Sequence, residues 1–351
     1  MNQKIKVLVV DDSAMVREIL SKGLAMDPEL EVVGSASDPF YARDKILKLR
    51  PDVLTLDVEM PRMDGIEFLR RLIPQCPIPV VMVSALTERG KQITFDALDA
   101  GAIDFVTKPS IDIARGLNAM LCDLREKVKI AAKARVRIRD RKLLGKSPAA
   151  PIKKAPLAES TLKVIAIGAS TGGTDAIRQV LVNLPADIPG LVIVQHMPPG
   201  FTKMFADRLD TECTINVKEA QTGDKIIAGR ALIAPGDYHL VVKRSGGDYI
   251  AHCKQGEKVC GHRPSVEVLF QSLAENVGSN AIGVVLTGMG HDGADGLLEM
   301  RKKGARTLAQ DEATSVVFGM PKEAYKRGGA EEMVPIQKVA SKLVSMFTEE
   351  A

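Results

Sequence analysis

Several polar residues in the first third of the chain lie at the ends of short apolar runs. They are Asp11, Asp12, Asp57, Ser84 and Lys108. In an open parallel sheet the carboxyl ends of the strands line one crevice, so we expect three carboxylates, a hydroxyl and an ammonium group to meet there. A single acid at a strand end is usually only a loop residue. Suitable residues at so many strand ends favour a functional site.

This predicted cluster suits phosphoryl chemistry. Clustered carboxylates repel one another unless a positive charge lies among them, and Mg²⁺ prefers such oxygen ligands, so Asp11, Asp12 and Asp57 are the expected metal site. Asp57 would be the nucleophile toward a phosphoryl donor. Lys108 and Mg²⁺ would balance the developing charge, and Ser84 would contact the phosphoryl oxygens.

A glycine-rich turn, IGASTGG (167–173), follows the apolar run TLKVIA in the second half of the chain. A dinucleotide-binding GxGxxG motif would need its second glycine where this chain has Ser170, and no Gly-Lys-Ser/Thr follows for a phosphate-binding Walker loop. The same residues fit GxSxG, in which small neighbours permit a tight turn that exposes a serine hydroxyl. Ser170 is therefore a candidate nucleophile if a base and an acid accompany it.

The chain offers five candidate bases, His196, His239, His252, His262 and His291. His196 ends the apolar run GLVIVQ, at the carboxyl end of what should be a neighbouring parallel strand. His239 and His252 lie in a segment, GRALIAPGDYHLVV (229–242) and GDYIAHCK (247–254), that resembles a β-hairpin region outside the parallel sheet. His262 lies in a loop and is placed to line a substrate cleft. We therefore expect His196 to be the catalytic base.

Asp292 is the expected orienting acid, because it lies in a glycine-rich turn after the apolar strand AIGVVL. Asp295, one helical turn further on, is the alternative as an ordinary acidic residue at a helix start. His291 is adjacent to Asp292, but neighbouring side chains in a turn usually diverge. His196 would then take the proton of Ser170 as the serine oxygen attacks an acyl carbon, with Met289 contributing a backbone oxyanion donor. The chain order Ser, His, Asp differs from that of the α/β-hydrolases.

Two doubly wound parallel-sheet domains are expected to position these residues, because apolar strands alternate with helical segments in both halves. At 351 residues the chain is long enough for two domains. Between Arg125 and Ala158 there are twelve Lys or Arg residues against two acids, which leaves 36 basic and 42 acidic residues elsewhere. We interpret this stretch as a connecting segment whose first half can extend the preceding helix or dock on a neighbour; a role in binding nucleic acid or an acidic partner is the alternative.

Composition excludes several classes of function. The chain is 45% hydrophobic and 26% charged, has only 4% aromatic residues and lacks Trp, which disfavours a base-stacking nucleic-acid platform. The five cysteines are never in CxxC spacing, so reduced thiols are expected rather than a metal or redox site. No apolar run is long enough to cross a membrane, and the first residues do not form a signal peptide, so we expect a cytoplasmic protein without membrane insertion.

The first part of the chain resembles the receiver domains of two-component signalling. The motifs are VDDS (10–13), LDVEMPRMDG (56–65), VSA (83–85) and TKP (107–109). The resemblance implies a flavodoxin-like five-stranded domain with an aspartyl phosphate at Asp57, bound Mg²⁺, a switch hydroxyl at Ser84, an active-site lysine at Lys108 and a cis bond before Pro109. The module attached to the receiver must set its function.

The whole chain is similar to the bacterial chemotaxis protein-glutamate methylesterases. The additional motifs are IGASTGGTDAI (167–177), QHMPPGFT (195–202), APGDYHL (234–240), HRPSVEVLF (262–270), LTGMGHDGADG (286–296) and FGMPKEA (318–324). The resemblance implies a receiver at 1–124, a basic linker at 125–160 and, at 161–351, a Rossmann-like methylesterase domain with a β-hairpin insertion. It implies a triad of Ser170, His196 and Asp292 and an oxyanion contact from Met289. The chain departs from the family at His291, where Asn is common.

The same resemblance sets the expected reaction and partners. It implies demethylation of γ-glutamyl methyl esters and deamidation of glutamines on methyl-accepting chemoreceptors, with a chemotaxis histidine kinase as phosphodonor and no cofactor for ester hydrolysis. A receiver-controlled hydrolase acting on another acyl substrate is the first alternative. A response regulator with a non-catalytic output domain is the second. A transcriptional regulator would need a basic helix-turn-helix, whereas the second half is mildly acidic and rich in strands, so no nucleic-acid partner is expected.

Overall fold

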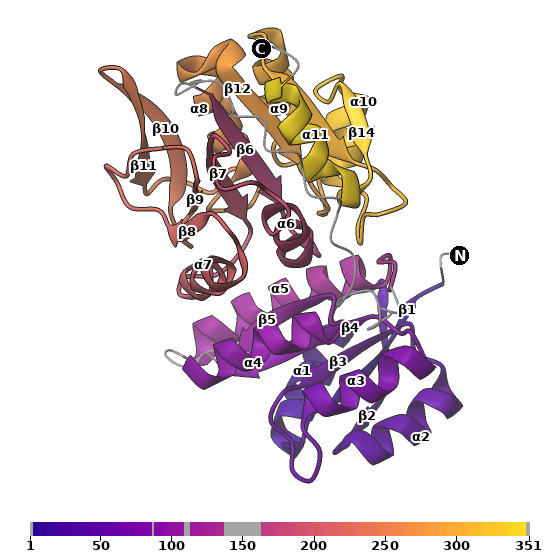
Figure 1. Ribbon diagram of the computed structural model, residues 1–351. Helices are drawn as coiled ribbons and strands as arrows, with labels where there is room; N and C mark the ends of the chain where they lie inside the picture. Colours follow the sequence, from indigo (N-terminus) through magenta and orange to yellow (C-terminus); the bar gives the residue numbers. More distant parts are fainter. Residues whose placement is uncertain (1–2, 86–87, 109–112, 137–162, 349–351) are drawn as a thin grey trace. The chain divides into compact units, whose positions relative to one another are not determined.

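A computed structural model describes residues 3–85, 88–108, 113–136 and 163–348 of the chain. The chain forms two compact units, Met1–Gly145 and Lys146–Ala351 (Figure 1). The cis bond expected before Pro109 and most of the expected linker lie outside the described residues.

The first unit alternates strands with helices. Its elements are β1 (Ile5–Val10), α1 (Ala14–Ala25), β2 (Leu30–Ala36), α2 (Pro39–Leu49), β3 (Val53–Asp57), α3 (Gly65–Gln75), β4 (Val80–Ala85), α4 (Glu88–Asp99), β5 (Asp104–Lys108) and α5 (Ile113–Ala131). Side chains cap the starts of α1, α2 and α3, where Ser13, Asp38 and Asp64 accept hydrogen bonds from backbone amides of the first turn. The last helix, α5, ends at Ala131. The basic stretch from Arg125 therefore extends the preceding helix, as predicted, as far as that residue.

The five strands of this unit form one parallel sheet in the order β2-β1-β3-β4-β5. In the sheet, β2 and β3 lie on opposite sides of β1, so the chain crosses from one side of β1 to the other between β2 and β3. The strand order therefore reverses between β1 and β3, where open parallel sheets place their sites. Asp11 and Asp12 follow β1, and Asp57 ends β3.

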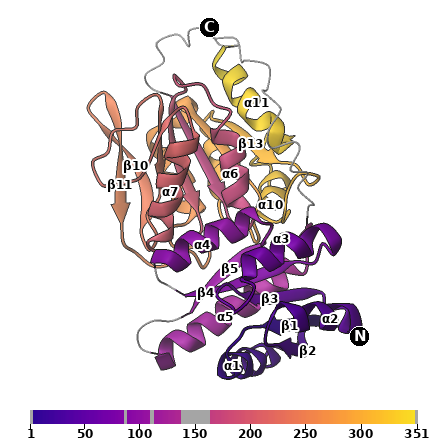
Figure 2. The ribbon, with the colours of Figure 1, turned by 60° about the horizontal axis from the view of Figure 1, so that its bottom comes forward.

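The second unit contains more strands. Its elements are β6 (Val164–Ala169), α6 (Gly173–Leu181), β7 (Gly190–Gln195), α7 (Phe201–Glu212), β8 (Asn216–Glu219), β9 (Arg230–Ile233), β10 (His239–Ser245), β11 (Asp248–Lys254), α8 (Val266–Asn276), a 3₁₀ turn η1 (Gly278–Asn280), β12 (Ala281–Val285), α9 (Ala294–Lys302), β13 (Arg306–Gln310), α10 (Met320–Lys326), β14 (Glu332–Val334) and α11 (Ile336–Thr348). Helix α6 lies close to α7 and α11 (Figure 2). Helix α8 lies close to α9 and to strand β10. Among the helices of the described ranges, none has both the length and the apolar character needed to cross a membrane.

Seven strands of this unit form a parallel sheet in the order β14-β13-β12-β6-β7-β9-β8. The antiparallel pair β10–β11 forms a separate hairpin that carries His239 and His252, as predicted. One detail of that prediction was wrong, because β9 belongs to the parallel sheet. Strand β9 is short and apolar, and its pairing with β7 and β8 buries it more fully than a hairpin would. The order reverses at β6, whose neighbours are β7 and β12.

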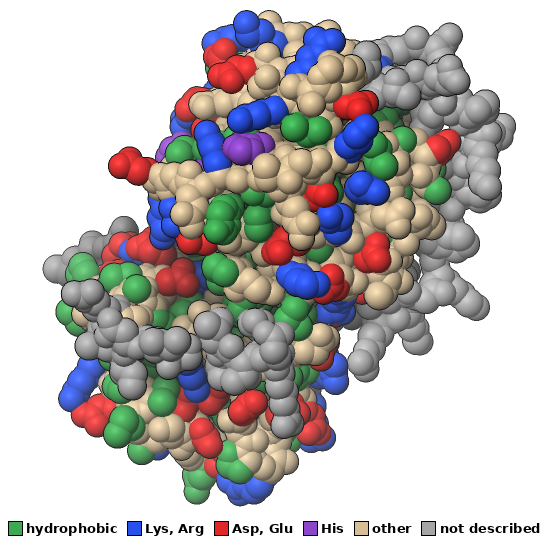
Figure 3. All heavy atoms as spheres, turned by 90° about the vertical axis from the view of Figure 1, so that its left-hand side faces the viewer, with side chains coloured by type: hydrophobic (Ala, Val, Ile, Leu, Met, Phe, Trp, Pro, Cys, Tyr) green, Lys and Arg blue, Asp and Glu red, His purple; other side chains and the backbone are tan. Residues whose placement is uncertain are grey.

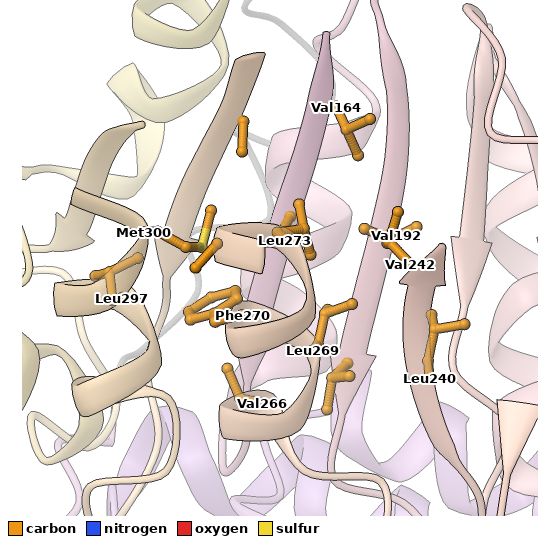
Figure 4. Packing of buried hydrophobic residues seen from close by; sticks show 14 of the residues in the cluster. Val164, Val192, Leu240, Val242, Val266, Leu269, Phe270, Leu273, Leu297 and Met300 are labelled. Atoms are coloured by element: carbon orange, nitrogen blue, oxygen red, sulfur yellow. The ribbon is translucent and has the colours of Figure 1, made fainter. Parts of the chain in front are cut away.

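Helix α8 packs on the sheet through a continuous apolar face. Leu269, Phe270 and Leu273 of this helix are fully buried, with Phe270 directed toward Leu297 and Met300 of α9 (Figure 4). Burial of each such side chain contributes about 1.5–3 kcal/mol, so the helix is fixed firmly in position. Its amino end is thereby held beside the turn that follows β12, and this position determines the geometry of the candidate site in the second unit.

Charge on the surface is mixed. On the face shown in Figure 3, Lys and Arg side chains are interspersed with Asp and Glu side chains. The five cysteines are free.

Candidate active site and phosphoacceptor site

Strand register brings Ser170 and His196 to adjacent positions. Ala169 at the end of β6 pairs with Gln195 at the end of β7, so Ser170 and His196 are the next residue on each of two neighbouring strands. The amide of His196 donates to the carbonyl oxygen of Ala169 over 3.2 Å. On the other side, the amide of Ser170 donates to the carbonyl oxygen of Thr287, just beyond β12, over 3.0 Å. Three strand ends therefore meet at Ser170.

Asp292 contacts the ring of His196. The separation of His196 Nε2 and Asp292 Oδ2 is 2.8 Å, and both side chains are buried. Asp295 instead forms an ion pair with Arg327, and its side chain is 61% exposed. The structure therefore brings together the histidine and the acid that the strand-end argument selected, and places the alternative acid on the surface.

The amino end of α8 holds the Asp292 carboxylate. Oδ1 accepts hydrogen bonds from Ser265 Oγ at 2.8 Å and from the Glu267 amide at 2.9 Å, and Oδ2 accepts from the Val266 amide at 2.8 Å. These amides are first-turn donors that have no partner within the helix, and the helix dipole also favours a negative charge there. Burial by itself raises the pKa of Asp292, but the hydrogen bond and charge of His196 and the amides of Glu267 and Val266 outweigh it, so the pKa is lowered.

This arrangement determines which nitrogen of His196 is available. Ionised Asp292 can only accept hydrogen bonds, so Nε2 carries the hydrogen and donates it, and Nδ1 is left as the acceptor of the neutral ring. Nδ1 is buried and has no hydrogen-bond partner among the described residues. A basic nitrogen without a partner thus lies one strand away from the Ser170 turn.

His262 covers one face of the His196 ring. The two ring centroids are 3.7 Å apart and the rings are inclined by 13°, which is a stacked arrangement. The sequence placed His262 in a loop near a substrate cleft, and the structure brings it into direct contact with the predicted base. The stack restricts rotation of the imidazole and so fixes the direction of both of its nitrogens.

The side chain of Gln195 supports the turn that contains Ser170. Its amide Nε2 donates to the carbonyl oxygen of Ser170 over 2.9 Å. A Cβ atom at Gly173 would lie 2.1 Å from Gln195 Oε1 and 2.6 Å from the Ala169 Cβ, so only glycine fits where helix α6 begins. The glycines of the turn therefore serve close packing around a serine.

The peptide between Gly288 and Met289 is oriented by a neighbouring loop. The carbonyl oxygen of Gly288 accepts from the amides of Gly319 and Met320 at 3.0 and 2.8 Å. In a trans peptide the N–H points opposite to the C=O, so the Met289 amide faces away from this loop. A Cβ atom on Gly288 would lie 2.8 Å from the Ser170 Cβ, which shows how closely this peptide approaches the serine.

The first unit brings its predicted residues together as well. Lys108 Nζ lies 3.0 Å from Asp11 Oδ2 and 2.9 Å from Asp57 Oδ2. Ligand oxygens of Asp11, Asp12 and Asp57 all lie within 4.8 Å of one another. Three carboxylates at this spacing, one of them exposed, form the set of hard oxygen donors that suits Mg²⁺.

Charge in this cluster is incompletely balanced. Burial raises the pKa of Asp57 most, Lys108 lowers it and the neighbouring Asp11 raises it, so the pKa lies at about 6. The pKa of Lys108 is raised, because its two carboxylate partners outweigh the effect of its own burial. Three carboxylates face the single ammonium of Lys108, so two negative charges are not neutralised, and such a cluster attracts a cation.

Ser84 lies at the expected strand end, and its hydroxyl is bonded to helix α4. Ser84 Oγ donates to the Gly90 carbonyl oxygen over 3.2 Å and accepts from Thr94 Oγ1 over 2.9 Å. Thr94 Oγ1 also lies 2.7 Å from the same carbonyl oxygen. Two partners of the Ser84 hydroxyl, Gly90 and Thr94, therefore belong to α4.

Sequence reasoning missed the residues that support the site. Ser265 precedes the apolar helix VEVLF and is its N-cap, a position that a serine before a helical pattern indicates. That signal locates a helix start, but it does not show which anion the helix start binds. Gln195 and Thr287 have no recognisable sequence signal, because their roles depend on neighbouring turns far away in the chain.

The fold and the two sites define the class of the protein, a response regulator whose second unit carries serine, histidine and aspartate at its switch point. The chain belongs to the CheB methylesterase family. The model of the CheB methylesterase family matches residues 165–343, and that of the response regulator receiver domain matches residues 7–120.

Individual relatives agree with this assignment over the whole chain. The protein-glutamate methylesterase/protein-glutamine glutaminase of Syntrophotalea carbinolica is 61% identical over 99% of this chain and 99% of its own length. An enzyme of the same name from Cupriavidus metallidurans is 54% identical over 97% and 96% of the two chains. The crystal structure of the Thermotoga maritima CheB methylesterase catalytic domain is 40% identical, with a TM-score of 0.52, and covers 52% of this chain and 98% of that one. The resemblance and the fold class predicted from the motifs are confirmed.

Proposed function

We propose that the protein is a phosphorylation-regulated serine hydrolase. It demethylates γ-glutamyl methyl esters, and deamidates glutamines, on methyl-accepting chemoreceptors. The observation that carries the proposal is the Asp292–His196 contact, which leaves Nδ1 of His196 without a partner beside the Ser170 turn. Family membership and the names of the relatives support the choice of substrate.

The first half of the reaction forms an acyl-enzyme. Ser170 Oγ attacks the ester carbon while His196 Nδ1 takes the serine proton, and the new C–O bond converts the carbonyl oxygen to an oxyanion. The Met289 amide is the proposed donor to that oxyanion, and such a donor typically lowers the activation barrier by about 2.7–4 kcal/mol. When the tetrahedral intermediate collapses, the bond to the methoxy oxygen breaks and His196 returns the proton, so methanol leaves.

The second half releases the product. Water gives a proton to His196 and adds to the acyl carbon, the bond to Ser170 breaks, and the serine regains its proton. The receptor residue leaves as glutamate. With a glutamine substrate the same steps release ammonia, because His196 protonates the leaving nitrogen. No cofactor takes part in either half.

Asp292 stabilises the cationic form of His196 throughout. Four donors keep the carboxylate ionised and in place, so the positive charge that appears on the imidazole always faces a negative partner. The stacked His262 ring keeps the imidazole from turning away. The site is therefore organised before substrate binds, which reduces the cost of reorganisation.

The receiver is proposed to control this activity. Asp57 accepts a phosphoryl group from a chemotaxis histidine kinase, and Lys108 stabilises the charge on the phosphoryl oxygens. Asp11, Asp12 and Asp57 would hold Mg²⁺, which supplies charge neutralisation during phosphoryl transfer. Ser84 would exchange its contacts with α4 for the phosphoryl group. The proposed boundaries are 1–124 for the receiver and 161–351 for the hydrolase, joined by a basic segment that continues from α5, in a cytoplasmic protein.

The test is release of methanol from methylated receptor membranes, with and without a small phosphodonor. We expect Ser170→Ala to abolish release while Asp57 is still phosphorylated, and Asp57→Asn to retain basal release without stimulation. An organophosphonate should label Ser170 in the parent protein and fail to label Ser170→Ala. Labelling without methanol release would identify a hydrolase for another acyl substrate. Failure to label would favour a non-catalytic output unit.

A further inference from the structure

The loop between β11 and α8 contains a tight turn at residues 259–262. Val259 and His262 exchange two backbone hydrogen bonds of 3.1 and 3.0 Å, and Cys260 and Gly261 form the two residues between them. Both have positive φ, 52° and 83°, which is the pattern of a type I′ turn. Cys260 therefore lies at the exposed tip of the same turn that supplies the His262 ring.

Cys260 faces His291, which lies in the turn after β12. Cys260 Sγ and His291 Nε2 are 4.0 Å apart, and both side chains are exposed. Thiolate sulfur and imidazole nitrogen are the ligands that Zn²⁺ prefers, with bond lengths of about 2.3 and 2.0–2.1 Å. A tetrahedral ion bound by this pair requires the two atoms to lie about 3.6 Å apart, which small side-chain movements achieve.

The surrounding charges favour a dication at this position. Partial loss of water around the Cys260 sulfur raises the pKa of its thiol most, and the carboxylates of Asp292, Glu267 and Asp295 raise it further, to about 11. The thiol is therefore a weak nucleophile near neutral pH. The carboxylates that disfavour a lone thiolate nevertheless attract a divalent cation, and a bound cation reverses the effect of its surroundings on the thiol.

We propose that Cys260 and His291 form a binding site for one soft divalent cation, Zn²⁺, with water completing its coordination, and that the bound ion inhibits the hydrolase. Binding forms Zn–S and Zn–N bonds and releases the thiol proton to solvent, so affinity rises with pH. This site is separate from the oxygen ligands of the receiver. Its inhibitory effect rests on the proposed hydrolase function, but its existence does not.

Inhibition follows from the position of the pair. One ligand belongs to the turn that carries His262, which stacks on His196, and the other is adjacent to Asp292 in the chain. A bound ion links these two turns and places positive charge beside the histidine that must itself become positive when it takes the serine proton. Like charges disfavour that step, so the rate of acyl-enzyme formation falls.

The metal site is tested by titrating the EDTA-treated full chain with Co²⁺ in the presence of excess Mg²⁺, which occupies the receiver carboxylates. We expect a sulfur-to-cobalt charge-transfer band that carboxylates cannot produce. The band should be lost in Cys260→Ser and in His291→Asn, and retained in Cys122→Ser, which removes another exposed thiol. Absence of the band from the parent protein, or its persistence in either of the first two variants, overturns the site.

Inhibition is measured in a second experiment. With excess Mg²⁺ present, Zn²⁺ should lower methanol release by the parent protein by about tenfold, a change that corresponds to 1.4 kcal/mol, and EDTA should restore it. Cys260→Ser and His291→Asn should have near-parent basal activity and lose most of the inhibition. Equal inhibition of both variants would place the inhibitory ion elsewhere and overturn this part of the proposal. A protein without any esterase activity would contradict the proposed function, while the cobalt band would still decide the metal site.

Discussion

Asp57 and Asp292 are buried aspartates at the switch points of two parallel sheets, and burial raises the pKa of both, yet their net pKa shifts have opposite signs. Asp57 is 5% exposed and its pKa is raised to about 6, whereas Asp292 is 2% exposed and its pKa is lowered. The difference lies in their donors. Lys108 and one backbone amide serve Asp57, which also faces the carboxylate of Asp11. Four donors converge on Asp292.

This contrast matches what each carboxylate is proposed to do. An oxygen that must form a bond to phosphorus needs an accessible lone pair, and incomplete hydrogen bonding provides it. A carboxylate that must only support a histidine gains from complete hydrogen bonding, because its charge and direction then stay constant. The structure therefore suggests that donor number, more than burial, separates a reacting carboxylate from a supporting one.

The largest expected effect comes from removing the charge of Asp292. Asp292→Asn keeps the shape of the side chain but cannot stabilise the imidazolium, and its amide disturbs the tautomer of His196. We expect the kcat for methanol release to fall by about 10³–10⁴-fold, as in related triads. Asp295→Asn is the matched control, because Asp295 pairs with Arg327 at the surface, and it should change kcat less than about twofold. Comparable losses in both variants would contradict the assignment of the acid.

The second prediction concerns the stability of the receiver. Asp57 has a pKa of about 6 in the folded state, against 3.8 for an ordinary aspartate, so the folded state holds the proton more tightly than the unfolded state. Its contribution to stability is present at low pH and is lost as the pH rises from about 4 through 6. Asp57→Asn removes this buried charge and should stabilise the receiver at pH 7.5 by roughly 1–3 kcal/mol.

Hydrogen exchange of amides in β1 and β3 measures this effect in the full chain, with EDTA present so that no cation binds the carboxylates. The gain should shrink as the pH is lowered and be small near pH 4. Asp52→Asn, in which the changed side chain accepts from the Lys6 amide at an exposed site, is the control and should lack the pH-dependent gain. A gain that stays constant with pH would show that Asp57 is ionised at all these values.

The parts of both sites that could be predicted from the sequence are those that depend on strand ends. Asp57, Ser170 and His196 each end an apolar run, and the parallel register brings such residues together. The donors to Asp292 could not be predicted, because Ser265 lies 27 residues away and reaches it only through the packing of α8 on the sheet. The choice between the two nitrogens of His196 and the placement of β9 also depend on three-dimensional packing.

A third prediction reduces the number of donors to Asp292. Ser265→Ala removes the hydroxyl that donates to Asp292 Oδ1 and the N-cap of α8, which should lower the stability of the hydrolase unit by about 1 kcal/mol. The pKa of Asp292 should rise, so loss of activity on the acid side should move to higher pH, and kcat should fall by about tenfold, or 1.4 kcal/mol.

Ser272→Ala separates the two effects, because Ser272 lies on the same helix and its hydroxyl accepts from the Val242 amide. This control should lose stability in urea unfolding and keep the pH profile of methanol release unchanged. Ser265→Thr should restore most of both properties. If Ser265→Ala loses stability alone, the hydroxyl is only a helix cap.

The smallest expected effect concerns the hydroxyl of Ser84, which contacts α4 in this structure. Ser265 donates to Asp292, whereas Ser84 donates to Gly90 and accepts from Thr94. Thr94→Val removes one partner of Ser84, which lowers the free-energy cost of moving the Ser84 hydroxyl to a phosphoryl group. At subsaturating phosphodonor, methanol release should therefore increase by about two- to fivefold, equivalent to about 0.4–1 kcal/mol. Thr55→Val is the control, since Thr55 Oγ1 is buried without a partner among the described residues, and it should leave the response unchanged. If Thr94→Val also leaves the response unchanged, the contacts of Ser84 with α4 do not limit its movement. The different hydrogen bonds of Ser265 and Ser84 would then describe only the unphosphorylated state.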